Sequence, residues 1–198
     1  MVFCLRALIT TLLLLMAGCA TTIQESKRLS DPQSTPKGLA FIWSAAKPPA
    51  FSALPAFGAA MIGTSASKSW ENYDSEFSAF GTSLKQRLEE EPSLKAVSVV
   101  ALPAKHTQQQ LDSETKGARS DTAVVVMYPE RVTSYCTPGC YAFKVRVNYL
   151  SPGSRKTVWT GLIDLPPKAK HSDPFDPLAL DFYTALAKQL STERLLPQ

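Results

Sequence analysis

Residues Tyr141–Tyr149, with the sequence YAFKVRVNY, decide the fold of this 198-residue chain. Aromatic and aliphatic side chains alternate strictly with other residues along this stretch, as in a strand that buries one face and exposes the other. A Ser-Pro-Gly-Ser turn follows at 151–154, and Lys156–Leu165 (KTVWTGLIDL) returns as the hairpin partner. Before the hairpin, Thr122–Tyr128 (TAVVVMY) is a continuous apolar run suited to a strand buried on both faces. We therefore predict three antiparallel strands between residues 122 and 165.

Two amphipathic helices are predicted, one before and one after these strands. The first ends before Pro92, and its apolar face consists of Tyr73, Phe77, Phe80, Leu84 and Leu88 at three- and four-residue spacing. The second begins with Asp176 as N-cap and Pro177 as its first residue. Its buried stripe consists of Leu178, Phe182, Ala185, Leu186 and Leu190.

Shorter elements complete the predicted architecture. We expect strands at residues 39–43 (LAFIW) and 96–102 (AVSVVAL), and a short exposed helix at 105–117. This order of strands and helices predicts an α/β protein, a two-layer sandwich. A mixed sheet of about four to five strands is expected, with helices packed on one face.

The first eighteen residues are typical of a signal peptide. Arg6 precedes an apolar run at residues 7–16, which is too short to span a bilayer. The next residues, Met16-Ala17-Gly18-Cys19, resemble the lipobox of bacterial lipoproteins. In that family the signal is cleaved before the cysteine, which is lipidated. The resemblance implies that acyl chains on Cys19 anchor the protein in the lipid bilayer. Ala20, where inner-membrane lipoproteins of Gram-negative bacteria tend to have aspartate, implies the periplasmic face of the outer membrane.

The sequence predicts three segments. Residues 1–18 are the signal peptide, and residues 19–37, which are polar with two prolines, follow as the lipidated cysteine and a disordered tether. Residues 38–198 then form one globular periplasmic domain.

The remaining cysteines favour a disulfide. Cys4 leaves with the signal and Cys19 carries lipid, so Cys136 and Cys140 remain as a pair in an exported, oxidising compartment. The Pro-Gly turn between them brings the two side chains together. A redox or zinc site is the alternative, but a redox motif would be C-x-x-C and zinc needs more ligands nearby.

The middle of the chain is similar to a family of periplasmic lipoproteins. A helix, a strand, a short polar helix ending in Gly117-Ala118-x-x-Asp121 and an apolar strand at 124–126 resemble their core. The family includes the amino-terminal domain of the Tol translocation protein, the lipoprotein activators of peptidoglycan synthases and the curli-secretion lipoprotein. The resemblance covers about residues 70–195 and implies a non-enzymatic role in envelope assembly.

No catalytic motif stands out, and we expect no catalytic residue, metal or cofactor. The chain has 21 Lys and Arg against 17 Asp and Glu, too mild an excess for nucleic-acid binding. A Ser or Cys nucleophile would need His106 or His171, the only histidines, as its base. His171, Asp173 and Asp176 lie close enough in sequence to hold a metal, but aspartates there also suit a helix start.

Two surfaces are candidate partner-binding sites. Lys144 and Arg146 share the exposed face of one strand, and Phe51, Leu54 and Phe57 lie in a Pro-rich loop at 47–57. The leading hypothesis is a tethered, non-catalytic accessory or scaffold protein that binds another envelope protein. The alternatives are an envelope hydrolase, or a lipoprotein that binds a small ligand or lipid in an apolar cavity.

Overall fold

The computed structural model describes residues 21–32, 34–46, 50–53, 74–136, 140–167 and 175–197. Its strands are β1 (Thr22–Arg28), β2 (Gly38–Ser44), β3 (Ala50–Ala53), β4 (Ala96–Leu102), β5 (Thr122–Cys136), β6 (Cys140–Leu150) and β7 (Thr157–Leu165). Its helices are α2 (Asp74–Glu90), the 3-10 turn η2 (Pro92–Leu94), α3 (Gln108–Gly117) and α4 (Phe175–Thr192). The described part of the chain holds no helix that is both long and apolar enough to span a membrane.

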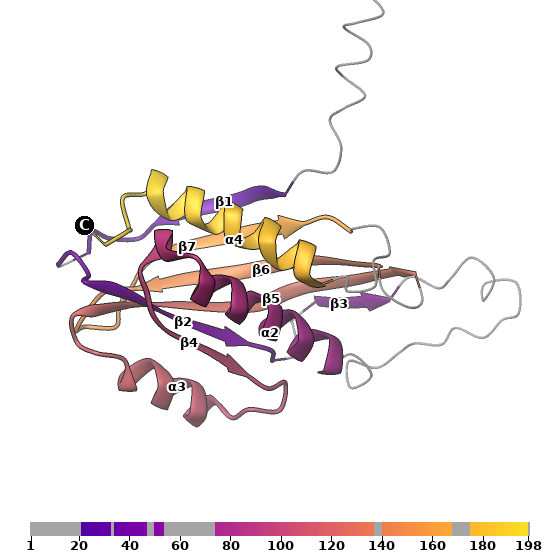
Figure 1. The fold of residues 1–198 in the computed structure, drawn as a ribbon, viewed down its shortest axis with the longest axis horizontal. Helices are drawn as coiled ribbons and strands as arrows, with labels where there is room; N and C mark the ends of the chain where they lie inside the picture. The colour runs from indigo at the N-terminus through magenta and orange to yellow at the C-terminus, as the bar shows by residue number, and fades with distance from the viewer. Residues whose placement is uncertain are drawn as a thin grey trace, which may run out of the picture.

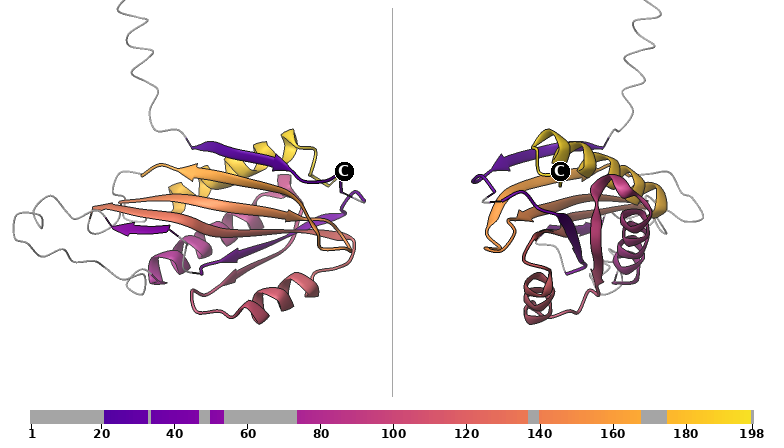
Figure 2. Two further views of the ribbon diagram at one scale, coloured as in Figure 1. Left: turned by 180° about the vertical axis from the view of Figure 1, so that it is seen from behind. Right: turned by 60° about the vertical axis from the view of Figure 1, so that its left-hand side comes forward.

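The strands form one mixed sheet, in the order β1-β7-β6-β5-β2-β4, with β3 paired to β5 (Figure 1). β5, β6 and β7 pair antiparallel, whereas β2 runs parallel to both β4 and β5. The α/β sandwich and the mixed sheet are therefore confirmed, with seven strands in place of four or five. Figure 2 shows that α2 and α4 cover one face of the sheet, the inner face. α3 lies on the opposite, outer face, which corrects the prediction that the helices pack on one face only.

Residues 22–28 form β1, which corrects the disordered tether expected over residues 19–37. β1 pairs antiparallel with β7 along its length and makes the outermost strand of the sheet. Its side chains are almost all exposed, with only Ile23 half-buried against the core. Because the strand is held by the backbone ladder of β7, it does not need the apolar alternation that identified the other strands.

The inner face holds the main core. Alternate residues of the strands meet the apolar stripes of α2 and α4, as the two helix patterns predict. Its largest fully buried side chains include Trp43, Trp159, Phe77, Phe80, Phe143 and Phe182. The Phe80 ring stacks on that of Phe143, with ring centroids 5.3 Å apart. This face is therefore filled by large aromatic side chains.

A smaller apolar cluster lies on the outer face beneath α3. Ala40, Ile42, Val124 and Val126 point outward from β2 and β5 and are covered by Leu111 of α3. Thr107 begins this helix with a capping box, in which its hydroxyl accepts from the Gln110 amide. α3 has no fully buried residue, in agreement with the predicted exposed helix.

The start of α4 differs from the prediction. The helix begins at Phe175, and the carboxylate of Asp176 accepts hydrogen bonds from Arg87 of α2 at 2.8, 2.9 and 3.1 Å. The pKa of Arg87 is raised, first by this hydrogen bond and then by the charge of Asp176. Asp176 thus joins α4 to α2, in place of the predicted N-cap role.

Tyr149 should make the stability of the fold sensitive to high pH. Its side chain is fully buried, and its hydroxyl donates to the Leu195 carbonyl at 3.0 Å. Burial raises its pKa above the ordinary value of 10.0. Above pH 10 the phenol therefore ionises in the unfolded chain but stays neutral in the folded one, so the free energy of unfolding falls as the pH rises.

We expect Tyr149→Phe to lose about 1 kcal/mol at neutral pH, since one hydrogen bond is removed. Its stability should then fall less steeply than that of the wild type between roughly pH 9 and 11. Urea unfolding across this range, with Tyr128→Phe on the outer face as control, measures both effects. An unchanged alkaline slope in Tyr149→Phe would contradict the account.

Candidate interaction surface

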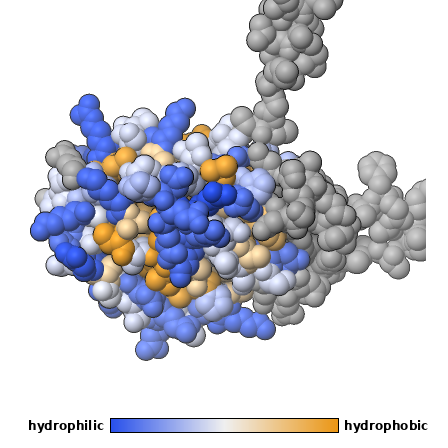
Figure 3. All heavy atoms as spheres, viewed as in Figure 1, coloured by the Kyte–Doolittle hydropathy of each residue, from blue (hydrophilic) through white to orange (hydrophobic). Residues whose placement is uncertain are grey.

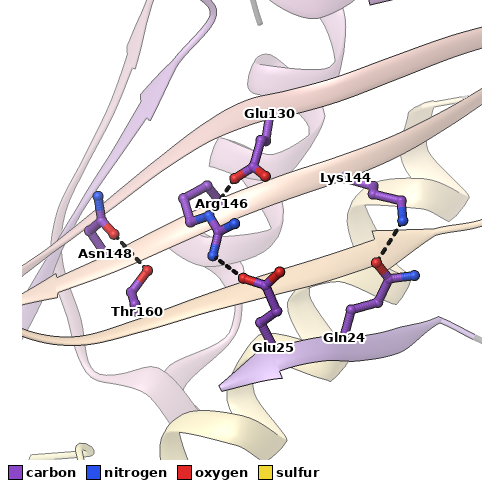
Figure 4. Close-up of polar contacts among 7 residues, drawn as sticks. All are labelled: Gln24, Glu25, Glu130, Lys144, Arg146, Asn148 and Thr160. Carbon is purple, nitrogen blue, oxygen red and sulfur yellow. Dashed lines mark hydrogen bonds and ion pairs between the residues drawn. The ribbon is translucent and has the colours of Figure 1, made fainter. Parts of the chain in front are cut away.

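The strict alternation of β6 places its polar side chains on the outer face of the sheet. Residues 143, 145, 147 and 149 are buried, and the intervening residues are half-buried. Lys144, Arg146 and Asn148 therefore form a row along β6 on this face (Figure 4). The polar face is defined as these three residues together with the partners that contact them from neighbouring strands: Gln24, Glu25, Glu130, Thr160 and Asp164.

Arg146 is the centre of the polar face. Its Nε donates to Glu130 of β5, and its Nη1 donates to Glu25 of β1 at 2.7 Å (Figure 4). The guanidinium side chain is only 16% exposed, against 33% for Glu130 and 57% for Glu25. Its pKa is raised, mainly by the hydrogen bond to Glu130, while partial burial opposes the rise. Arg146 is thus a fixed cation that joins three strands.

Lys144 and Asn148 are also paired. Lys144 Nζ donates to Gln24 Oε1 at 2.6 Å and lies 3.5 Å from a carboxylate oxygen of Asp164. Asn148 Oδ1 accepts from the Thr160 hydroxyl at 2.9 Å. The two predicted cations therefore share one face, as expected, but each has an acidic neighbour. With two cations and three carboxylates, the polar face is a surface of mixed charge with hydrogen-bonding groups in place of a basic patch.

The acidic partners could not be identified from the sequence. Glu25 lies 121 residues from Arg146, in the segment predicted as tether. Glu130 lies at a register shift of β5 between Pro129 and Arg131, beyond the strand predicted at 122–128. Since pairing across strands depends on register, only the alternation within β6 was visible in the sequence.

Arg146 should contribute measurably to stability. We expect Arg146→Ala to lower the free energy of unfolding by about 1–2 kcal/mol, because two charge-assisted hydrogen bonds are lost and Glu130 is left partly buried. Arg119→Ala, which removes a 73% exposed arginine paired with Asp121, should change stability little. Chemical denaturation of both variants tests the difference. Equal effects would mean that the Arg146 network adds nothing beyond an exposed ion pair.

The other predicted partner surface lies mostly outside the described residues. Phe51 belongs to β3, opposite Val132 of β5, and its side chain is not described. Leu54 and Phe57 lie outside the described residues. On the face viewed in Figure 3, hydrophobic side chains appear in small separate patches among hydrophilic ones. The described residues on this face therefore form no large apolar docking patch.

The predicted disulfide has a suitable backbone setting. Cys136 ends β5 and Cys140 begins β6, and the two are directly opposite in the antiparallel ladder. Opposite residues have Cα atoms about 4.5–5.5 Å apart, within the range that a disulfide spans. Their side chains lie outside the described part, so the bond remains a prediction, as does the lipidation of Cys19.

His106 makes the polar contact that a hydrolase hypothesis would require. Its Nε2 lies 3.0 Å from Ser44 Oγ, and its Nδ1 lies 2.6 Å from the Pro103 carbonyl. Because a carbonyl only accepts, Nδ1 donates to it, and in a neutral ring Nε2 then accepts from the serine hydroxyl. Ser44 is only 3% exposed, and no described carboxylate contacts His106. His171 and Asp173 lie outside the described residues.

A cavity of about 380 Å³ lies where the chain between β1 and β2 meets the end of the domain. Its lining is mixed, with Arg28, Asp31, Arg194 and Tyr149 beside Leu195 and Leu196. Arg28 is already paired with Asp31 at 3.1 Å. A lipid carrier needs an apolar cavity, so this polar lining does not favour that alternative. Among the described residues, no three His, Cys, Asp or Glu side chains gather into a metal site.

No protein-family model matches the chain, and no curated protein matches it in sequence. Several solved structures are similar. The PelC dodecamer from Paraburkholderia phytofirmans gives a TM-score of 0.40 at 15% identity, covering 88% of this chain and 98% of that chain. A putative neuraminyllactose-binding hemagglutinin homolog from Helicobacter pylori gives 0.39 at 14%, covering 84% and 90%. Lipoprotein GNA1162 from Neisseria meningitidis gives 0.31 at 12%, covering 78% and 99%. All three TM-scores are below 0.5.

Proposed function

We propose that this chain is a lipid-anchored envelope protein of the outer membrane's periplasmic face, which acts without catalysis by binding another envelope protein. The observation that carries the proposal is the position of β1. The strand begins at Thr22, three residues after the lipobox cysteine, and is joined to the sheet by β7. A lipid on Cys19 would therefore attach directly to the folded domain.

The short link restricts where the domain lies. Three residues span at most about 11 Å between the Cα atoms of Cys19 and Thr22. Thr21, just before the strand, donates to Asp181 of α4 at 3.2 Å. The domain would lie against the membrane, with its β1 edge nearest the lipid anchor. It would not be held at a distance from the membrane by a long flexible tether. A partner would then be another component of the same membrane surface.

The polar face is the surface we assign to that partner. Its half-buried cation, paired carboxylates and amide groups form a fixed pattern of donors and acceptors on the strands. Such a pattern favours a specific polar interface, which needs complementary hydrogen bonds more than apolar burial.

Cross-linked pull-down of the tagged full chain from intact envelopes tests this role, with Cys19→Ser as reference. We expect one envelope protein to be enriched with the wild type and lost with Asn148→Arg on the polar face. Thr184→Arg, at an exposed position of α4, should retain it. Retention by Asn148→Arg would exclude the polar face, and no specific enrichment would count against an accessory role.

The Ser44–His106 contact supports a second candidate, an envelope serine hydrolase. In that case Ser44 would attack an ester carbonyl while His106 Nε2 takes its proton. Under the main proposal we expect no labelling of the full chain by a fluorophosphonate probe, because Ser44 is almost fully buried. Labelling of Ser44 that disappears in His106→Ala would establish the hydrolase instead.

A further inference from the structure

The two edges of the sheet differ in chemistry. β1 forms one edge with the sequence TIQESKR, which includes a glutamate, a lysine and an arginine. β4 forms the other edge with AVSVVAL, which has no charged residue. Charged side chains are a common protection of edge strands against pairing with another chain. Of these two end strands, β4 lacks this protection, as does the short β3 (AFSA), which pairs only with β5.

Several side chains of β4 are exposed, and no described strand pairs with its outer side. Val97 is 52% exposed, the highest value among the exposed large hydrophobic residues of the described chain, and Ser98 and Ala101 are exposed as well. Val97 is the additional residue at a register shift against β2, and its Cγ1 lies over Gly38. A Cβ built on Gly38 would lie 2.4 Å from Cγ1 of Val97. The Val97 side chain therefore occupies the space above Gly38 and lies against the sheet.

The backbone of β4 presents bonding groups on its outer side. The Leu102 carbonyl accepts from Ala45 at the end of β2. In a parallel ladder, the N–H and C=O groups of one residue point to the same neighbouring strand, and every second residue points the same way. Val100, two residues before Leu102, therefore also directs its N–H and C=O groups toward β2. Val99 and Ala101 therefore direct their N–H and C=O groups away from the sheet. Within the described chain no strand pairs with them.

We propose that the β4 edge pairs antiparallel with β4 of a second copy of this chain, about a two-fold axis through Val99. Val99 would then face its own copy, and Ser98 would face Val100 of the other chain. No two charged residues would meet within the paired strands. A similar pairing of β1 about Glu25 would place two glutamates opposite one another, which disfavours it.

Identical strands suit this arrangement because a two-fold interface uses the same surface twice. The axis is normal to the sheet, so both copies present α2 and α4 on the same side. Their β1 strands then lie at equal height along the axis. Two copies on one membrane surface are therefore compatible with the pairing. The inference itself does not depend on the proposed function.

Charge substitutions at Ser98 test the pairing sharply, since the two Ser98 side chains would lie diagonally across the axis on one face. Sedimentation of the full chain in detergent should show a concentration-dependent dimer, with a Kd on the order of micromolar for such a small interface. Ser98→Lys alone and Ser98→Glu alone should each raise the Kd at least tenfold through like-charge repulsion. An equimolar mixture of the two variants should restore association.

Ser78→Lys, at an exposed position of α2, is the matched control and should leave the Kd unchanged. A wild-type chain that stays monomeric at every concentration would overturn the proposal, and would leave the edge to a strand of a different protein. Equal weakening by Ser98→Lys and Ser78→Lys would overturn it too. Failure of the mixture to associate would exclude the two-fold register. Membrane association is not measured, so this result and a failure of the anchor are distinguishable.

Discussion

A Cys19→Ser chain is expected to leave the membrane fraction almost completely. Each buried CH₂ of an acyl chain contributes about 0.8 kcal/mol to membrane binding, and two or three chains make the attachment durable. Loss of the thiol removes the attachment point for these chains.

Fractionation of detergent-free lysates measures this effect, with a soluble-to-membrane ratio that rises at least tenfold. Cys4→Ser, which changes a cysteine within the predicted signal peptide, is the matched control and should fractionate like the wild type. A Cys19→Ser chain that remains in washed membranes would show that another segment or a partner holds the protein there.

Trp43→Ala should have the largest effect on stability. The indole is 1% exposed, donates from Nε1 to the Phe77 carbonyl at 3.3 Å and meets the Phe80 ring edge-on at a centroid distance of 5.0 Å. Removing a buried tryptophan leaves a cavity and deletes this hydrogen bond, so we expect a loss of about 3–5 kcal/mol. Chemical denaturation followed by circular dichroism measures this loss.

Two further variants make the test specific. Leu180→Ala removes a side chain that is 43% exposed on α4, and should cost less than about 1 kcal/mol. Gly81→Ala adds a Cβ that would lie 2.4 Å from Cδ1 of Trp43, so overpacking should cost about 1–3 kcal/mol. If Trp43→Ala lowered the free energy of unfolding no more than Leu180→Ala, then α2 would not pack tightly on β2 through Trp43.

The central part of the fold was predictable because its strands carry their own signal. β6 alternates over its whole described length, β7 returns from a Pro-Gly turn, and the first half of β5 is continuously apolar. β1 lacked such a signal, because TIQESKR has a single apolar residue and is held by the ladder of β7. Tertiary pairing thus created a strand where local composition indicated a tether.

The polar face was predictable only in part, namely for its residues on β6. Alternation placed Lys144 and Arg146 on one exposed face, but the charge of that face depends on Glu25, Glu130 and Asp164 from other strands. Their positions follow from strand order and register, which one sequence does not specify. The contact of Ser44 with His106 was hidden for the same reason, since β2 and the turn after β4 meet only in the folded chain.

Intact mass spectrometry of the mature protein, purified from membranes with its amino terminus retained, tests the lipid anchor. We predict a chain that lacks residues 1–18 and begins at Cys19, with a mass increase that matches a diacylglyceryl group and, where present, an amide-linked acyl chain. A chain that retains Met1, or one that begins elsewhere with Cys19 unmodified, would contradict the lipid anchor and the membrane-bound role built on it.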